Sequence, residues 1–242
     1  CFGSVITMNS PGSPTAGKNN WEATLWHEYC HVITLTATKN RMPRWLSEGI
    51  SVYEEIERHP NWGQKMTPAY RSMILEEDAL LPVSDMSRAF FQAKSGEELM
   101  FAYYQSMLIV EFLVEEYGLE ALRGILSDLG DGALINGAIA RHTVPMAELE
   151  RDFAAYARDL ALAYGADLDW SELDTERVDP ASPESLREFL KENPDHFKAR
   201  QLLTIRLLEQ REWNEAAESA GRLKEMLPEV TGNANGYALQ AR

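Results

Sequence analysis

The segment His27-Glu28-Tyr29-Cys30-His31 places two histidines four positions apart, in a stretch whose pattern is typical of a helix. On a helix, residues at this spacing lie on one face about one turn apart, so both imidazole rings can reach a single metal ion. Glu28 lies beside that face, where its carboxylate can take a proton from a metal-activated water. These five residues predict a helix that carries two metal ligands, His27 and His31, and a general base, Glu28.

A third protein ligand is expected, because a catalytic zinc ion uses three protein ligands and keeps one position open. Glu48, in Trp45-Leu46-Ser47-Glu48-Gly49-Ile50, lies on the next predicted helix after a turn at Lys39-Asn40. Such a turn would bring Glu48 back onto the two histidines. Gly49 beside it would permit the close approach of another helix or backbone segment.

Other acids and histidines are less suited as ligands. Glu54 and Glu55 lie on the same predicted helix as Glu48 and are alternative third ligands, less favoured because they are farther from the helix start. His59 precedes a proline at a helix end, His142 lies in a predicted loop, and His196 lies in the C-terminal part. We expect these three histidines to be surface or structural residues.

Helix signals cover most of the remaining chain, and Cys1 to Met8 is the stretch with the β-branched, apolar pattern of a strand. Asn19 or Asn20 is suited to cap the motif helix, which is expected to end near Thr38. Ser95-Gly96-Glu97-Glu98 is a capping box, and the apolar sequence after it predicts a buried central helix that ends at Gly118. Further helices are predicted at Pro43–Glu57, Pro68–Glu77, Val83–Ala93, Leu119–Leu129, Ala133–Ala140 and Met146–Tyr164. The expected fold class is mainly α.

Composition excludes several classes of protein. The net charge of −15 disfavours nucleic-acid backbones and anionic membranes as partners. No apolar run approaches the roughly 20 residues of a membrane-spanning helix. Cys1 and Cys30 belong to no redox or zinc motif, and Cys30 is expected in the core. Because the chain begins with Cys1, we favour a fragment boundary there, with a periplasmic or lipid-anchored bacterial protein as the alternative.

The C-terminal part has a different pattern. Gly165 to Ser182 is acidic, has little periodicity and is interpreted as a linker. Pro194 and Pro228 are about 34 residues apart, which is the period of tetratricopeptide repeats. Three positions that are usually apolar or small in such a repeat carry suitable residues: Leu203, Ala216 and Leu223. A plain helical hairpin is the alternative interpretation.

The sequence H-E-x-x-H followed by W-L-S-E-G resembles the gluzincin metallopeptidases, most closely the bacterial peptidase MA-like proteins that often carry tetratricopeptide repeats. Gly49 to Glu55 and Ala102 to Ser106 also resemble this family, and the resemblance covers about Cys1 to Tyr164. It implies a zincin-like domain at residues 1–165, a linker at 166–182 and tetratricopeptide-repeat-like helices at 183–242. Gluzincins place a small β-sheet before the motif helix, to which Cys1 to Met8 corresponds here.

The resemblance also implies an activity, the hydrolysis of peptide bonds by a zinc metallopeptidase with Glu28 as general base. The implied zinc ligands are His27, His31 and Glu48. A tyrosine hydroxyl stabilises the oxyanion in similar enzymes, which corresponds to Tyr103, with Tyr104 as second choice and core packing as the alternative for both.

A second function is compatible with the same motifs. The chain would then be a non-catalytic, zinc-containing scaffold or peptide-binding protein that acts through its repeat-like tail, because such repeats form concave peptide-binding surfaces. The intact Glu28 favours the enzyme. The expected partners are a peptide or protein substrate and a further protein bound by the tail. Exopeptidase and endopeptidase activities both fit the motifs.

Overall fold

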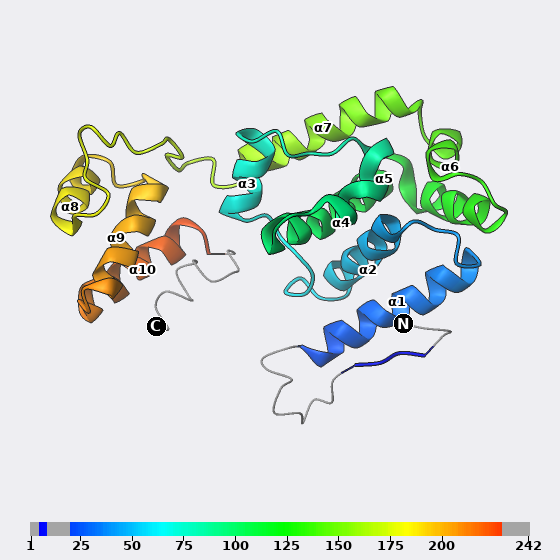
Figure 1. Ribbon diagram of the computed structural model, residues 1–242, viewed down its shortest axis with the longest axis horizontal. Coiled ribbons are helices and arrows are strands. Elements are labelled where there is room, and N and C mark those ends of the chain that lie inside the picture. The colour runs from blue at the N-terminus through cyan, green and yellow to red at the C-terminus, as the bar shows by residue number, and fades with distance from the viewer. Residues whose placement is uncertain (1–4, 9–19, 229–242) are drawn as a thin grey trace. The chain divides into compact units, whose positions relative to one another are not determined.

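The computed structural model describes residues 5–8 and 20–228 of the chain. These residues form ten α-helices and one short 3₁₀ helix (Figure 1). Within the described residues there is no regular β-strand, and Val5 and the pair Asp169–His196 form isolated bridges. The predicted mainly α fold is confirmed. The strand predicted at Cys1 to Met8 lies partly outside the described residues, and residues 6–8 have no regular structure.

The chain divides into two compact units, Cys1–Gln64 with Met73–Leu160, and Lys65–Ser72 with Ala161–Arg242. The helices of the first unit are α1 (Trp21–Ala37), α2 (Arg44–Arg58), η1 (Val83–Arg88), α4 (Ala89–Gln92), α5 (Gly96–Gly130), α6 (Ile135–His142) and most of α7 (Met146–Ala163). The second unit contains α8 (Pro183–Glu192), α9 (Phe197–Glu209) and α10 (Trp213–Met226), while α3 (Pro68–Leu75) has residues in both units.

Helix α1 carries the H-E-x-x-H motif and begins as predicted. The side chain of Asn20 accepts hydrogen bonds from the backbone N–H groups of Glu22 and Ala23, at 3.1 and 3.3 Å, so Asn20 is the N-cap. The helix ends at the predicted turn, where Lys39 and Asn40 both have left-handed backbone conformations, with φ of 53° and 58°. This turn reverses the chain and brings α2 back against α1.

Helix α2 packs against both α1 and α5 (Figure 1). Its buried face includes Trp45 and Leu46, which are 1% and 0% exposed. A side chain at Gly49 would place its Cβ 2.4 Å from the carbonyl oxygen of Ser106 in α5, so the predicted close approach of two helices is confirmed. This contact fixes the position of α2, and with it the position of Glu48.

Helix α5 is the predicted buried central helix. The hydroxyl of Ser95 accepts a hydrogen bond from the N–H of Glu98 at 3.1 Å, which confirms the predicted cap. Ile109 and Val110, near its middle, are both 0% exposed. Gly118 has φ of 81° and interrupts the helical backbone, and helical structure resumes directly after it. The predicted end of one helix at Gly118 and start of another directly after it are therefore confirmed, and α5 consists of these two helical segments.

The helix predicted at Val83–Ala93 is wrong in one respect, since the chain forms the 3₁₀ helix η1 followed by the four-residue α4. The carboxylate of Glu150, in α7, accepts hydrogen bonds from both the backbone N–H and the hydroxyl of Ser84. These long-range bonds restrain the first turn of η1. Short 3₁₀ segments of this kind are common as connectors.

In the second unit, α9 packs against α8 and α10. Its core contains the three residues that fit the repeat pattern, Leu203, Ala216 and Leu223, all less than 5% exposed. His196 was expected to be structural, and its Nδ1 accepts a hydrogen bond from the N–H of Ala199 at 3.1 Å, which caps α9. Among the residues that the structure describes, no helix is both long and apolar enough to cross a membrane.

Candidate metal centre

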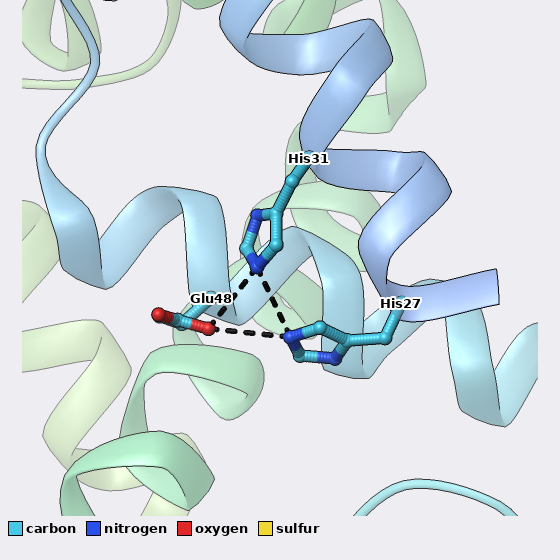
Figure 2. A group of neighbouring side chains, drawn as sticks. All are labelled: His27, His31 and Glu48. Atoms are coloured by element: carbon cyan, nitrogen blue, oxygen red, sulfur yellow. Dashed lines mark hydrogen bonds and ion pairs between the residues drawn. The ribbon is translucent and has the colours of Figure 1, made fainter. Parts of the chain in front are cut away.

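Three predicted ligand side chains meet where α1 and α2 face each other (Figure 2). Nε2 of His27 lies 3.1 Å from Nε2 of His31, and Oε2 of Glu48 lies 3.3 Å from each of these nitrogens. His27 and Glu48 are half-buried, and His31 is 8% exposed. The structure thus brings together the three residues that the sequence favours as ligands.

This triangle fits a tetrahedral zinc ion. Zinc bonds of about 2.0–2.2 Å to nitrogen and oxygen place neighbouring ligand atoms about 3.3–3.6 Å apart in a tetrahedron. The three observed separations, 3.1, 3.3 and 3.3 Å, are close to that edge length. Two imidazole nitrogens and one carboxylate oxygen also form a donor set that catalytic zinc sites use. The group can therefore hold a metal ion with little rearrangement.

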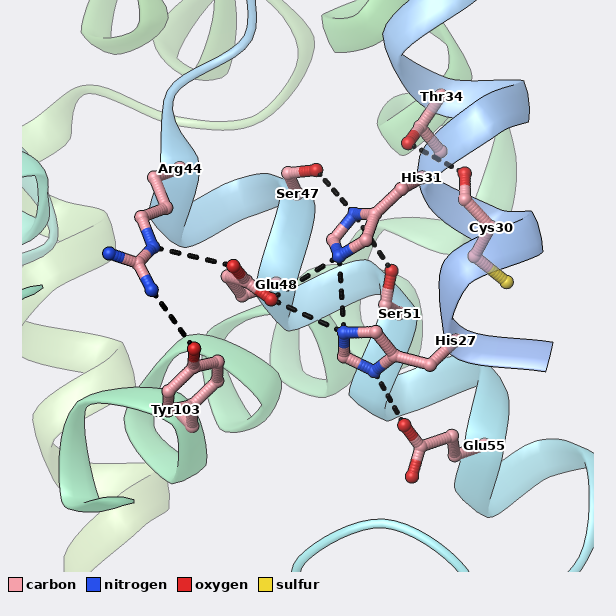
Figure 3. Close-up of polar contacts among 10 residues, drawn as sticks. All are labelled: His27, Cys30, His31, Thr34, Arg44, Ser47, Glu48, Ser51, Glu55 and Tyr103. Carbon is pink, nitrogen blue, oxygen red and sulfur yellow. Dashed lines mark hydrogen bonds and ion pairs between the residues drawn. The ribbon is translucent and has the colours of Figure 1, made fainter. Parts of the chain in front are cut away.

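The ring of His27 is held from its other side by Glu55 (Figure 3). Oε1 of Glu55 lies 2.5 Å from Nδ1 of His27, and Oε2 of Glu55 accepts a hydrogen bond from the N–H of Gly63 at 2.9 Å. A carboxylate at Nδ1 favours the tautomer that leaves the Nε2 lone pair free for a metal. Glu55 was an alternative third ligand on sequence grounds. In the structure it contacts His27 and lies outside the triangle of His27, His31 and Glu48.

The ring of His31 is oriented by two serines of α2. Its Nδ1 lies 2.8 Å from Oγ of Ser47 and 3.2 Å from Oγ of Ser51 (Figure 3). Both hydroxyls are in buried residues. Hydroxyl oxygens accept from an N–H at Nδ1, so this ring too presents Nε2 to the centre of the triangle.

Arg44 links Glu48 to Tyr103. Its Nε donates to Oε1 of Glu48 at 3.3 Å, and its Nη2 donates to the hydroxyl of Tyr103 at 3.0 Å (Figure 3). The guanidinium lies 4.6 Å from the centre of the Phe90 ring, and Phe90 meets Tyr103 edge-on. One cation therefore restrains both the outer oxygen of Glu48 and the phenol that the sequence singled out.

The charges in this group are strongly coupled. Burial lowers the pKa of His27, but the hydrogen bonds and charges of Glu48 and Glu55 outweigh it and raise the pKa to about 9. Burial raises the pKa of Glu48, yet the bonds from His27 and His31 hold that pKa well below its usual range. A positive imidazole and a negative carboxylate thus face each other where a cation would lie.

The other predicted residues occupy varied positions. Glu28 directly follows His27 in α1 and is half-buried, and Tyr104 is 3% exposed in the core. The backbone oxygen of Glu54 accepts a hydrogen bond from the indole N–H of Trp26, and its carboxylate is not part of the ligand triangle. Burial, with the charges of two nearby glutamates, raises the pKa of Cys30 to about 12, so this residue is a buried thiol as expected.

The remaining histidines are away from the triangle. His59 is exposed and stacks on Trp62, with ring centres 5.6 Å apart. The loop predicted at His142 is wrong, since His142 is the last residue of α6, and its Nε2 lies 3.0 Å from a carboxylate oxygen of Asp128. The expectation that these residues have surface or structural positions is confirmed.

Sequence reasoning did not find the supporting residues of the site. Ser47, Ser51 and Glu55 follow one another at four-residue spacing, so they lie on one face of α2 that includes Glu48. That spacing is a signal that could have been used. The contact between Arg44 and Tyr103 joins residues on two separate helices and has no local signal.

Comparison with known proteins identifies the family of the chain. No curated protein and no solved structure matches the chain. The model of one protein family, described as the Peptidase MA superfamily, matches residues 12–159. This stretch includes α1, α2 and the three clustered side chains, and it covers more than half of the chain. The protein belongs to the Peptidase MA superfamily.

Proposed function

We propose that the chain is a zinc metallopeptidase of the gluzincin type, which hydrolyses peptide bonds in peptides or proteins. The observation that carries this proposal is the triangle of ligand atoms, 3.1–3.3 Å apart, between α2, which carries Glu48, and α1, which carries both histidines and Glu28. Membership of a peptidase superfamily supports a protein or peptide as substrate.

Three residues would hold the zinc ion: His27 and His31 through Nε2, and Glu48 through Oε2. When bound, zinc would supply a Lewis acid that polarises the substrate carbonyl and lowers the pKa of the attacking water toward about 7. Glu55, Ser47 and Ser51 would keep the two imidazole rings in the required tautomer and orientation. A ligand ring that is free to rotate binds metal with lower affinity, so these supporting residues would increase the affinity for zinc.

Glu28 would act as the general base. It directly follows His27 on α1, so its carboxylate would lie beside the metal ligands without being one of them. The carboxylate would accept the proton of the attacking water as the carbon–oxygen bond forms. It would then give that proton to the amine nitrogen as the carbon–nitrogen bond breaks.

Tyr103 would donate a hydrogen bond to the carbonyl oxygen as negative charge develops there. Its oxygen already accepts a hydrogen bond from Arg44, so its own hydrogen is available for donation. The positive charge of the guanidinium makes the phenol a stronger donor. Tyr104 is a poorer candidate, because it is 3% exposed.

The C-terminal helices would form a tetratricopeptide-repeat-like region that binds a protein partner or presents substrate. The packing of α9 against α8 and α10, with small or apolar residues at three repeat positions, supports this interpretation. Each repeat packs only on its neighbours in such regions, so extended binding surfaces form between helices.

The test is a comparison of the native chain with Glu28→Gln on a quenched fluorescent peptide library, with zinc per chain measured in both. The variant should keep its zinc and lose at least about 100-fold in cleavage rate, as expected for a general base. Glu22→Gln is the matched control, since Glu22 is an exposed acid on the same helix. Equal cleavage by the native chain and Glu28→Gln would contradict the role of Glu28. Zinc binding without any cleavage would favour the non-catalytic scaffold.

A further inference from the structure

Two apolar side chains at the start of α5 lie next to Tyr103. Leu99 is half-buried, and Met100 is 45% exposed. They precede Tyr103 by four and three residues, so the three side chains lie on one face of the helix. Side chains of a helix lean toward the preceding turn, which directs the ring of Tyr103 toward Leu99 and Met100. We call these two residues the apolar ledge.

The apolar ledge is continuous with the metal centre through Tyr103. The hydroxyl of Tyr103 accepts a hydrogen bond from Nη2 of Arg44 at 3.0 Å, and Nε of Arg44 donates to Oε1 of Glu48 at 3.3 Å (Figure 3). One turn of an α-helix rises about 5.4 Å, while successive residues of an extended peptide are about 3.3 Å apart. A peptide whose scissile carbonyl faces Tyr103 therefore has a neighbouring side chain within reach of the apolar ledge.

Phe90 closes one side of this region. It is 9% exposed, and its ring meets the ring of Tyr103 edge-on, with ring centres 4.9 Å apart. The guanidinium of Arg44 lies 4.6 Å from the centre of the Phe90 ring. These contacts restrain the phenol and the guanidinium, so the surface beside the apolar ledge is formed before a ligand binds. Preformed apolar surface with a few placed polar groups is typical of ligand sites.

The charges around the apolar ledge disfavour a charged side chain of either sign. Arg44 would repel a lysine or arginine of the substrate. Glu97 and Glu98 directly precede the ledge in the first turn of α5, and the chain has a net charge of −15, so an acidic side chain is also repelled. Burying a charge against Leu99 and Met100 would in addition cost its hydration. An uncharged, apolar side chain has none of these costs.

We propose that the apolar ledge is a substrate subsite, which takes an apolar side chain directly beside the scissile bond. This inference rests on the proposed peptidase function and narrows its substrates to peptides with such a residue. Met100 suits this role, because the flexible and polarisable side chain of methionine adapts to ligands of different shape. Contact with the substrate would remove from water the part of Met100 that is exposed in the free chain.

The test uses quenched fluorescent peptides Gly-Gly-Gly-X-Gly-Gly-Gly, in which X is Leu, Asn, Asp or Lys, with the whole zinc-loaded chain. Mass spectrometry identifies the bond that is cleaved. The Leu peptide should be cleaved at a bond next to Leu, with kcat/KM at least about tenfold above that of the Asn peptide, as expected for discrimination by an apolar subsite. Met100→Gln should remove most of this preference and keep its zinc. A merely structural defect would instead lower the cleavage of all four peptides by the same factor.

Leu119→Gln is the matched control, because Leu119 is an apolar residue of the same helix, 44% exposed, beyond the kink at Gly118. It should leave the preference for Leu unchanged. Equal kcat/KM for the Leu and Asn peptides, or an unchanged preference in Met100→Gln, would overturn the subsite and leave the proposed peptidase function in place. No cleavage of any peptide by the zinc-loaded chain would contradict the peptidase function and the subsite together.

Discussion

Oε1 of Glu55 lies 2.5 Å from Nδ1 of His27, on the side of the ring opposite the nitrogen that faces Glu48. Glu55 is itself restrained by the N–H of Gly63. A carboxylate in this place orients a ligand histidine and increases its basicity. The acid that seemed a rival for the third ligand position on sequence grounds therefore has a supporting geometry instead.

Removing this support should weaken metal binding without abolishing it. Glu55→Ala is expected to raise the Kd for zinc by about 10- to 100-fold, the usual effect of losing such a partner. Competition with a chromophoric chelator measures this change. Glu57→Ala is the control, since Glu57 is an exposed acid of the same helix. An unchanged Kd in Glu55→Ala would show that Glu55 does not hold the ring.

Metal binding should release a proton. The pKa of His27 in the metal-free chain is raised to about 9, so its ring is charged at neutral pH and must lose that proton to bind a cation. The raised pKa also contributes stability to the metal-free chain, which is complete below pH 6.5 and is lost as the pH rises through about 9. Calorimetry at pH 7.5 in buffers of different ionisation enthalpy should report release of about one proton per zinc. Release of none would contradict the charge state assigned to His27.

Arg44 should matter more to turnover than to metal binding. Arg44→Lys cannot make both of its hydrogen bonds, because an ammonium group lacks the planar fork of donors that reaches Glu48 and Tyr103. We expect kcat to fall by about 10- to 100-fold, in the range seen when a transition-state donor is displaced. Tyr103→Phe should lower kcat at least as much.

Steady-state kinetics on one peptide separates kcat from KM. The control is Arg88→Lys, because Arg88 is an exposed arginine paired with Asp85. A normal kcat in both Arg44→Lys and Tyr103→Phe would remove this pair from the mechanism.

The contact at Gly49 should be intolerant of any side chain. Gly49→Ala would place a Cβ 2.4 Å from a backbone oxygen of α5, which forces the two helices apart. The expected loss in the free energy of unfolding is about 1–3 kcal/mol, typical of an overpacked core. Urea unfolding measures it.

Gly137→Ala is the control, because no described heavy atom lies within 4 Å of the point that its Cβ would occupy. Its expected effect on the free energy of unfolding is neutral or stabilising by up to about 1 kcal/mol. Equal stability of Gly49→Ala and the native chain would contradict the tight α2–α5 contact.

Much of the helical framework could be predicted because its signals are local. Asn20 and Ser95 are caps whose partners lie within three residues, and the spacing of His27 and His31 fixes their common face. The role of Glu48 could also be predicted, because a short turn after α1 restricts the direction of the next helix and brings it back against α1.

The parts that sequence reasoning missed depend on distant residues. Arg44 meets Tyr103 only because Gly49 lets α2 approach α5 closely. Ser84, in the 3₁₀ helix, is hydrogen-bonded to Glu150, which is far along the chain. The role of Glu55 depends on a loop N–H at Gly63. Patterns within one helix carry no information about such partners.

We expect His27, His31 and Glu48 to form one zinc site. The most direct measurement is zinc per chain by elemental analysis after dialysis, for the native protein, the double variant His27→Ala/His31→Ala, and His59→Ala as a control at an exposed histidine. We predict about one zinc per chain in the native protein and in His59→Ala, and none in the double variant, because a site with three protein ligands cannot lose two of them. A native chain without zinc, or a double variant that keeps it, would show that these three residues do not form a zinc site.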